Sequence, residues 1–403
     1  MTGRRRVAIT GAGTINALAD SVPGTLAALT DGRVGIGPLE FVDVERLSIR
    51  IGGQVRGWAT EGRFTRAQIA LYDRATQFAM SASAQAVAQA GLTLTDVETL
   101  RAGVIMGSAG GGYTTIDDAY RTVYPQGKNR VHPFTIPRLM HNAAAAHMAM
   151  AHGFKGPSFT VSTACASSNH AMGLAFQMIQ SGAAEVMLTG GSEATLCFGG
   201  IKAWEALRVL SPDGCRPFCA TRNGLVQGEG AAVFVFEDWD RARLRGADIL
   251  AEVAGFSMTS DAADIVVPDA DGALRAMQGA MTQAGLSPAD VGYINAHGTG
   301  TAINDRTEAR AITTQFGAQL PLVSSTKSMH GHLLGATGAV EALACILALR
   351  DGIIAPTMGH READPDCPVD CVPNEARRAQ VGAALSNAFA FGGMNACLAF
   401  KRA

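Results

Sequence analysis

The sequence lacks the features that define several large classes of protein. Its 403 residues carry a net charge of −2, so the chain as a whole has no bulk attraction for nucleic acid or an anionic membrane. No apolar run is long enough to span a bilayer, and no signal-peptide core follows the arginines at positions 4–6. Charged residues make up only 17% against 47% hydrophobic residues, which predicts a large core. We therefore expect a soluble cytoplasmic protein.

A disulfide framework and a phosphate loop are also missing. The eight cysteines do not indicate a secreted scaffold, because the chain is long and has no signal sequence. Two C-x-x-x-C pairs, Cys215/Cys219 and Cys367/Cys371, leave a zinc site open as an alternative, but their spacing matches zinc motifs weakly. Buried free cysteines commonly serve as small apolar residues, so we expect no metal. None of the Gly-rich segments has the pattern G-x-x-x-x-G-K-[ST].

What the sequence does contain is an alternation of strand-like and helix-like stretches. This alternation predicts a layered α/β fold, and the length fits two fused units. A charged helical stretch at 238–245 leads to Gly246, which we predict to end an N-terminal half (1–246) before a C-terminal half (247–403). The strands predicted in the second half lie at 249–253, 291–295, 322–325, 383–386 and 395–400.

The first candidate for chemistry is Cys165. Residues 162–168 have the sequence STACASS, which ends a β-rich run, and apolar residues at helical spacing follow. Cys165 is therefore predicted at a strand-to-helix junction, where unpaired amides and the helix dipole favour a thiolate. A buried structural cysteine remains the alternative for a lone residue of this type.

Two histidine segments strengthen the case for a reactive site. Residues 295–301 have the sequence NAHGTGT and follow an apolar strand, which places His297 at a carboxyl end of the sheet, where open α/β sheets bind ligands. Residues 325–332 have the sequence STKSMHGH and lead into an apolar helix that contains Glu341. Either histidine alone is more often a structural residue.

Together these three segments resemble the signature blocks of the β-ketoacyl-acyl carrier protein synthase family. Residues 385–395 (LSNAFAFGGMN) resemble a fourth block, and Arg216-Pro217-Phe218 with Gly228-Glu229-Gly230 a fifth, so the likeness runs nearly end to end. The segments 259–264 and 110–112 resemble synthase I more than synthase II. The resemblance implies the thiolase-like duplicated fold, with two similar α/β halves in an αβαβα arrangement, and a homodimer.

The resemblance also assigns roles, residue by residue. Cys165 resembles the acyl-carrying nucleophile, and His297 and His332 the paired histidines that hold the malonyl carbonyl during decarboxylation. Lys327 resembles the nearby lysine and Glu341 its buried partner, although a purely structural ion pair is the alternative. The implied reaction is acyl transfer to the cysteine and condensation with malonyl thioester to a 3-ketoacyl product.

Further residues are implied to bind substrate. Phe391 resembles an aromatic gate whose amide forms an oxyanion hole with that of Cys165. The candidates for substrate contact are Thr299, Thr301, Gly110, Phe389 and Phe391. At Gly110 synthase II members place a bulky isoleucine, so we predict an acyl tunnel that is open there, with a simple turn as the alternative.

The implied partner is acyl carrier protein, whose phosphopantetheine carries the substrates, so no separate cofactor is expected. The helix that usually docks carrier protein has alanine at positions 67 and 70. Candidates to compensate are Arg63, Arg66, Lys128 and Arg130, with ordinary solvated surface charge as the alternative for each alone.

Three rival functions stay open from the sequence. A degradative thiolase needs a second reactive cysteine in a carboxyl-terminal turn, but Cys397 lies in a predicted strand. A non-catalytic chain-length-factor-like subunit typically lacks the nucleophile, which this chain retains. A ketosynthase of a specialised polyketide or modified-lipid pathway uses the same site as a fatty acid enzyme.

Overall fold

The computed structural model describes residues 4–403, and its centre is a ten-stranded sheet in the order β10-β9-β13-β14-β8-β1-β7-β6-β4-β5. One half of the sheet contains β1 (Val7–Asn16), β4 (Ala102–Gly107), β5 (Ser158–Val161), β6 (Val186–Glu193) and β7 (Gly230–Asp238). The other contains β8 (Ala251–Ser260), β9 (Val291–Asn295), β10 (Leu322–Ser324), β13 (Ala383–Ala390) and β14 (Met394–Lys401).

The two halves repeat one topology. In the first, β4 pairs in parallel with β5 and β6, while β7 pairs antiparallel with β6 and β1. In the second, β9 pairs in parallel with β10 and β13, while β14 pairs antiparallel with β13 and β8. A short antiparallel pairing of β1 with β8 joins them. The predicted duplicated fold is thus confirmed, whereas the boundary at Gly246 stays a prediction.

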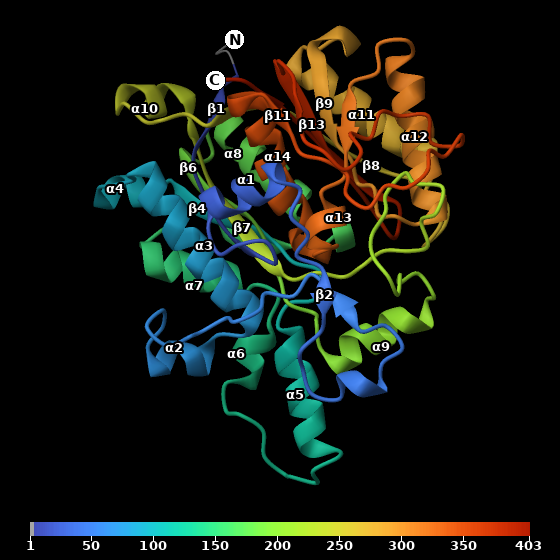
Figure 1. Ribbon diagram of the computed structural model, residues 1–403. Coiled ribbons are helices and arrows are strands. Elements are labelled where there is room, and N and C mark those ends of the chain that lie inside the picture. The colour runs from blue at the N-terminus through green and yellow to red at the C-terminus, as the bar shows by residue number, and fades with distance from the viewer. Residues whose placement is uncertain (1–3) are drawn as a thin grey trace.

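Helices cover both faces of the sheet and fill the space between its halves (Figure 1). The helices of these layers are α3 (Arg74–Ala90), α7 (Ala143–His152), α8 (Ser167–Gln180), α11 (Ala270–Ala284), α12 (Ala302–Phe316) and α14 (Thr337–Asp351). Helix α3 packs on the outer face of the first half and α11 on that of the second, while α8 and α14 contact both halves. Residues 337–349 of α14 are all buried, as expected of a helix that is apolar on every side.

Smaller elements lie around this frame. The remaining helices are α1 (Val22–Thr30), α2 (Arg66–Leu71), α4 (Asp96–Thr99), α5 (Tyr113–Val123), α6 (Thr135–Leu139), α9 (Phe198–Ala206), α10 (Trp239–Leu244) and α13 (Lys327–His330). Short strands form two further pairs, β2 (Gly37–Pro38) with β3 (Ile51–Gly52) and β11 (Ile353–Ile354) with β12 (Arg377–Arg378). Within residues 4–403, no helix has the length and apolarity needed to cross a membrane.

The duplication extends to two strained turns at the starts of the central helices. A 3₁₀ turn, η2 (Ala164–Ala166), precedes α8, and a second, η4 (Leu334–Ala336), precedes α14. The first residue of each turn, Ala164 or Leu334, has a positive φ of 47°, which is unfavourable for a side chain with a Cβ atom. The two turns pack against each other, so the starts of both helices meet in the middle of the molecule.

The close contact of α3 with β1 gives a test of the packing. A Cβ atom on Gly13 of β1 would lie 1.9 Å from the carbonyl oxygen of Ala82 in α3, whereas one on Gly382 would meet nothing within 4 Å. We expect Gly13→Ala to lower the free energy of unfolding by about 1–3 kcal/mol, because backbone must move. The control Gly382→Ala should change it by less than about 0.5 kcal/mol. Denaturant unfolding at one protein concentration measures both, and equal stability of the two variants would contradict this packing.

Candidate active site

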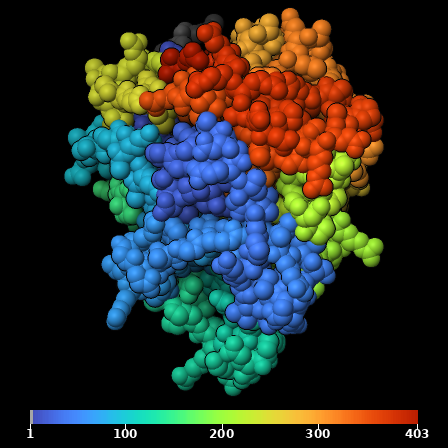
Figure 2. Space-filling view, viewed as in Figure 1, coloured from blue at the N-terminus to red at the C-terminus, as the bar shows by residue number. Residues whose placement is uncertain are grey.

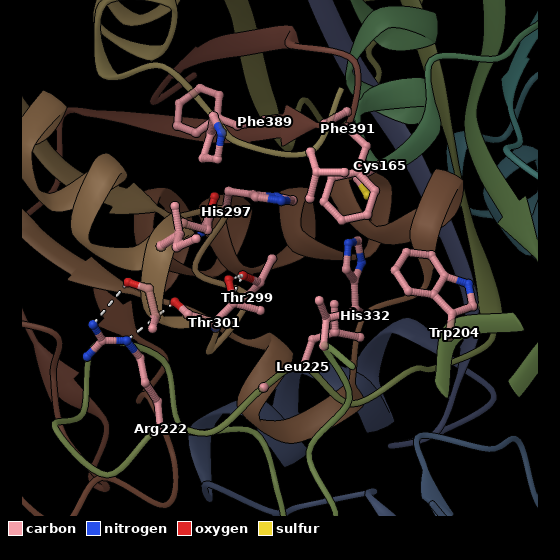
Figure 3. A pocket seen from close by; sticks show the side chains of 18 of the residues that line it. Cys165, Trp204, Arg222, Leu225, His297, Thr299, Thr301, His332, Phe389 and Phe391 are labelled. Atoms are coloured by element: carbon pink, nitrogen blue, oxygen red, sulfur yellow. Dashed lines mark hydrogen bonds between the residues drawn. The ribbon is translucent and has the colours of Figure 1, made fainter. Parts of the chain in front are cut away.

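A pocket of about 320 Å³ lies between the halves of the molecule. Cys165, after β5, and His297, after β9, line it together with His332, Thr299 and Thr301. Phe389 and Phe391, from the end of β13 and the turn after it, also line it (Figure 3). The structure therefore brings together side chains from four segments that lie far apart in the sequence.

Cys165 lies inside the strained turn η2, two residues before α8 begins, as the sequence predicts. Its side chain is buried, with 7% of the residue exposed. Burial raises the pKa of the thiol to about 11, although Lys327 and the backbone amides of Phe391 and Cys165 act in the opposite direction. The backbone amides at the helix start thus favour a thiolate, as expected, but desolvation has the larger effect on the pKa of this thiol.

The two predicted histidines face each other beside the sulfur. Ligand atoms of Cys165, His297 and His332 all lie within 4.8 Å of one another, and the imidazole centroids are 5.5 Å apart. Burial lowers the pKa of both histidines well below its usual value, and the charge of Lys327 lowers it further. Both rings are therefore neutral near pH 7.

The hydrogen bonds of His332 determine which ring nitrogen carries the proton. Its Nδ1 accepts from the backbone amide of Leu334 at 3.2 Å and lies 2.8 Å from the hydroxyl of Thr337. An amide can only donate, so Nδ1 holds a lone pair and the proton of the neutral ring is on Nε2. The buried Nε2 has no partner among residues 4–403. His332 thus offers a free N–H donor in the pocket.

Lys327 and Glu341 form a buried ion pair beneath this site. The Lys327 ammonium lies 2.6 Å from Oε1 of Glu341, and at most 1% of either side chain is exposed. Burial raises the pKa of Glu341 to about 7, while Lys327 lowers it. Because the charge of Lys327 also affects the pKa of Cys165, His297 and His332, the pair contributes to the electrostatics of the pocket.

Sequence reasoning missed two buried carboxylates that hold the loops of the site. Glu308 of α12 accepts the amides of His297 and Gly298 at 2.8 and 2.7 Å. Glu193, at the end of β6, accepts the amides of Ala109, Gly110 and Gly335 at 2.7–3.1 Å. A charge at the end of an apolar strand is the only sequence signal for Glu193, and Glu308 has none that separates it from an ordinary helix residue.

Gly110 is the predicted substrate-contact residue that the structure does not bring into the pocket. A Cβ atom on it would lie 3.1 Å from Thr195, 3.2 Å from Glu193 and 3.3 Å from the ring of Tyr113. These three side chains border the position within one chain, and the acyl tunnel expected near the dimer contact stays a prediction. Gly110 instead donates its amide to Glu193, which is the role of a turn residue.

Aromatic and hydroxyl side chains complete the pocket wall. Phe391 stacks on Trp204 of α9 with ring centroids 5.9 Å apart and an interplanar angle of 23°. The hydroxyls of Thr299 and Thr301 are 2.8 Å apart. Arg222 also lines the pocket and pairs with Asp364 and Asp305. Trp204 is another contact that the sequence did not predict.

The cysteines named as alternatives do not form rival sites. Within residues 4–403, the group of His, Cys, Asp and Glu atoms close enough to hold a metal is that of Cys165, His297 and His332, not the two C-x-x-x-C pairs. Cys397, which a thiolase would need in a turn, lies inside β14, where burial raises the pKa of its thiol. The C-x-x-x-C pairs are thus not grouped with a third ligand in the described part of the chain, and Cys397 lies in a strand as predicted.

Comparisons with known proteins agree on one family. The family described as beta-ketoacyl synthase matches with its N-terminal domain at residues 4–242 and with its C-terminal domain at residues 250–361. Nodulation protein E of Rhizobium sp. (strain N33) is 44% identical over 400 residues, which are 99% of each chain. The 3-oxoacyl-[acyl-carrier-protein] synthase 2 of Staphylococcus aureus (strain N315) is 40% identical over 411 residues, covering 100% of this chain and 99% of its own.

The solved structures extend this agreement to the fold. The structure of the ishigamide ketosynthase/chain length factor has a TM-score of 0.96 with 35% identity, and the match covers 100% of both chains. The relatives include a synthase 2 protein, so these comparisons give no support to the expected closer likeness to synthase I, which stays a prediction.

The electrostatic role of Lys327 has a measurable consequence. We expect iodoacetamide at pH 8 to alkylate Cys165 about tenfold more slowly in the double variant Lys327→Met, Glu341→Gln than in the parent protein. Loss of the positive charge raises the pKa of the thiol, and each unit of increase in that pKa lowers the thiolate fraction tenfold. Rates at Cys165 are measured by peptide mass spectrometry.

The single variant Glu341→Gln is the matched control, because it keeps the cation and removes its anionic partner. Its alkylation rate should equal or exceed that of the parent protein. A double variant that reacts as fast as the parent would show that Lys327 does not tune the cysteine.

Proposed function

This chain belongs to the β-ketoacyl synthase family and is a condensing acyltransferase, and we propose that Cys165 carries the growing acyl group while His297 and His332 act on malonyl-acyl carrier protein. One observation carries the assignment: the Nε2–H donor of His332, which has no partner in the described part of the chain, lies beside a buried sulfur and a second neutral imidazole. Neutral donors of this kind stabilise an oxygen that gains negative charge.

In the proposed first step, Cys165 attacks the thioester of an acyl carrier protein. The carbon–sulfur bond to Cys165 forms, the bond to the carrier sulfur breaks, and the thiol proton passes to the leaving thiolate. The backbone amides of Cys165 and Phe391 lower the pKa of this thiol, so they lie beside the sulfur, and we propose that they stabilise the oxyanion of the tetrahedral intermediate.

In the proposed second step, the carbonyl oxygen of malonyl thioester accepts hydrogen bonds from the N–H groups of His297 and His332. Carbon dioxide leaves, and the electron pair of the broken carbon–carbon bond forms an enolate held by these donors. The enolate carbon attacks the acyl group on Cys165, which releases the cysteine as a thiolate that takes up a proton. The product is a 3-ketoacyl thioester, one malonyl unit longer and without the lost carboxyl group.

The pocket wall suits the arm that delivers both substrates. Phosphopantetheine has amide groups along a flexible chain, and the hydroxyls of Thr299 and Thr301 offer it hydrogen bonds. Phe389 and Phe391 add apolar surface beside the sulfur. The proposed reaction needs no resident cofactor, and we propose a cytoplasmic location, where acyl carrier protein is available as partner.

A specialised pathway is the second candidate for the biological role. It is favoured by the 44% identity to nodulation protein E and by the likeness to a ketosynthase/chain length factor. The same chemistry serves fatty acid elongation and such pathways, so the distinction lies in the acyl group that the enzyme accepts. Competing acyl donors of graded length and unsaturation would separate the two roles.

The roles assigned to the site give a first prediction. Cys165→Ala should abolish covalent acylation and condensation but retain some malonyl decarboxylation, because the histidine donors remain in place. The matched control is Cys397→Ala, which removes a buried thiol outside the pocket and should acylate like the parent. Intact-mass spectrometry after incubation with acyl donor measures the adduct. An acyl adduct that persists in Cys165→Ala contradicts the assignment.

We also propose that the chain forms a homodimer. The edge strand β5 ends the sheet and exposes Phe159. The lobe formed by residues 113–140 projects from the body (teal in Figure 2) and exposes Tyr124 by 77% and Ile136 by 65%. Exposed apolar side chains that gather on one lobe favour burial in an interface, and a second copy presents the same lobe and the same free edge.

Sedimentation tests this proposal. The protein should sediment at twice the chain mass of 41.8 kDa. Tyr124→Asp with Ile136→Asp should dissociate the dimer, while the control Leu244→Asp, at a residue 91% exposed outside the lobe, should not. A parent protein that is monomeric alone, or dimeric only with a chain-length-factor-like subunit, would contradict the homodimer.

A further inference from the structure

One buried histidine near the pocket has no part in the proposed chemistry. His330 is the last residue of α13, the short helix that begins with Lys327, and it lies two residues before His332. None of its surface is exposed, and it does not line the pocket. An imidazole buried at this position needs a structural or functional reason, because its two nitrogens must both be hydrogen-bonded.

The hydrogen bonds of His330 define a single neutral tautomer. Its Nδ1 lies 2.7 Å from the carbonyl oxygen of Gly331, which can only accept, so Nδ1 carries the proton. Its Nε2 lies 3.0 Å from Oγ1 of Thr326 and therefore accepts the hydroxyl proton. Burial lowers the pKa of His330 to about 3, and the charge of Lys327 lowers it further, so the ring stays neutral near pH 7.

These bonds belong to a chain that connects the segments of both pocket histidines. Asn295, the last residue of β9, lies two residues before His297 and donates its Nδ2 to Oγ1 of Thr326 at 3.4 Å. Thr326 donates in turn to His330, which donates to the carbonyl of Gly331 next to His332. The hydrogen-bonded chain Asn295–Thr326–His330–Gly331 thus links the segment that contains His297 to the segment that contains His332. Lys327 is the residue after Thr326 in the sequence.

The backbone around this chain has little room to move. A Cβ atom on Gly53 or Gly228 would lie 2.0 or 2.5 Å from the carbonyl oxygen of His330. Gly331 has a φ of +77°, and the amide of His332 donates to Val226 at 2.7 Å. The carbonyl of Gly331 and the amide of His332 belong to one peptide group, so the bonds to His330 and to Val226 hold its two ends within a tightly packed turn.

We propose that His330 is a positioning residue that orients the turn of His332, and through it the Nε2–H donor, by its hydrogen bond to the carbonyl of Gly331. The proposal rests on the role of His332 given above. Its consequence is specific: loss of this bond weakens the decarboxylation step, for which His332 donates, and leaves acylation of Cys165 nearly unchanged. A residue that acts only on overall folding would affect both steps together.

Three substitutions separate the two bonds of the ring. His330→Ala removes both bonds and should slow malonyl decarboxylation about tenfold to a hundredfold, since a donor misplaced by about 1 Å has effects of this size. His330→Asn places an amide donor near the position of Nδ1 and should restore most of the rate. His330→Gln places an acceptor near the position of Nε2 and should not. Decarboxylation is followed by carbon dioxide release and acylation by intact-mass spectrometry, with thermal unfolding recorded for each variant.

The controls distinguish a failure of this inference from a failure of the proposed function. His332→Ala in the same assay tests the donor role itself. The variant His152→Ala removes a partly buried histidine, bonded to Ser83, that lies on α7 outside the pocket. If His332→Ala decarboxylates like the parent, the role of His332 is wrong. If His332→Ala is impaired and folded His330→Ala is not, only the inference fails. Rescue by glutamine instead of asparagine, or an equal loss of acylation and decarboxylation, would also overturn it.

Discussion

The proposed chemistry depends on one hydrogen bond, which the amide of Leu334 donates to Nδ1 of His332. This bond leaves the ring proton on Nε2, where no residue of the described chain accepts it. Burial and the charge of Lys327 lower the pKa of His332, so the ring stays neutral and carries a single N–H near pH 7. A fixed neutral donor stabilises a developing oxyanion without first having to reorganise.

The fold explains why such a bond exists. In the first half β5 leads into a tight turn and then α8, and in the second β10 leads through α13 into a tight turn and then α14. Both turns begin with a residue in the left-handed region, Ala164 or Leu334. The first turn presents Cys165, and the second supplies the amide that fixes His332. Glu193 bridges the second turn to the loop after β4 through the amides of Gly335 and Ala109. Duplication thus provides two similar turns that meet at one site and perform different tasks.

Much of this arrangement could be predicted from sequence, and the rest has physical reasons for being hidden. The strand at 291–295 has the predicted bounds, because its apolar run ends at a Gly-rich loop. Cys165, His297 and His332 lie in motifs whose order along the chain carries the family likeness. Glu308 and Trp204 were missed because their partners lie far away in sequence and only the packing of α12 and α9 brings them close.

Two expectations rested on local features alone. The helix start was expected to favour a thiolate at Cys165, and its amides do so, but burial has the larger effect on the pKa. Gly110 was expected to open a tunnel near the dimer contact, which stays a prediction, and within one chain Tyr113 and Thr195 lie beside this glycine. Neutron diffraction from perdeuterated crystals near pH 7 tests the central claim most directly, because it locates the protons on His332. The account predicts deuterium on Nε2 and none on Nδ1, and deuterium on Nδ1, or on both nitrogens, would contradict it.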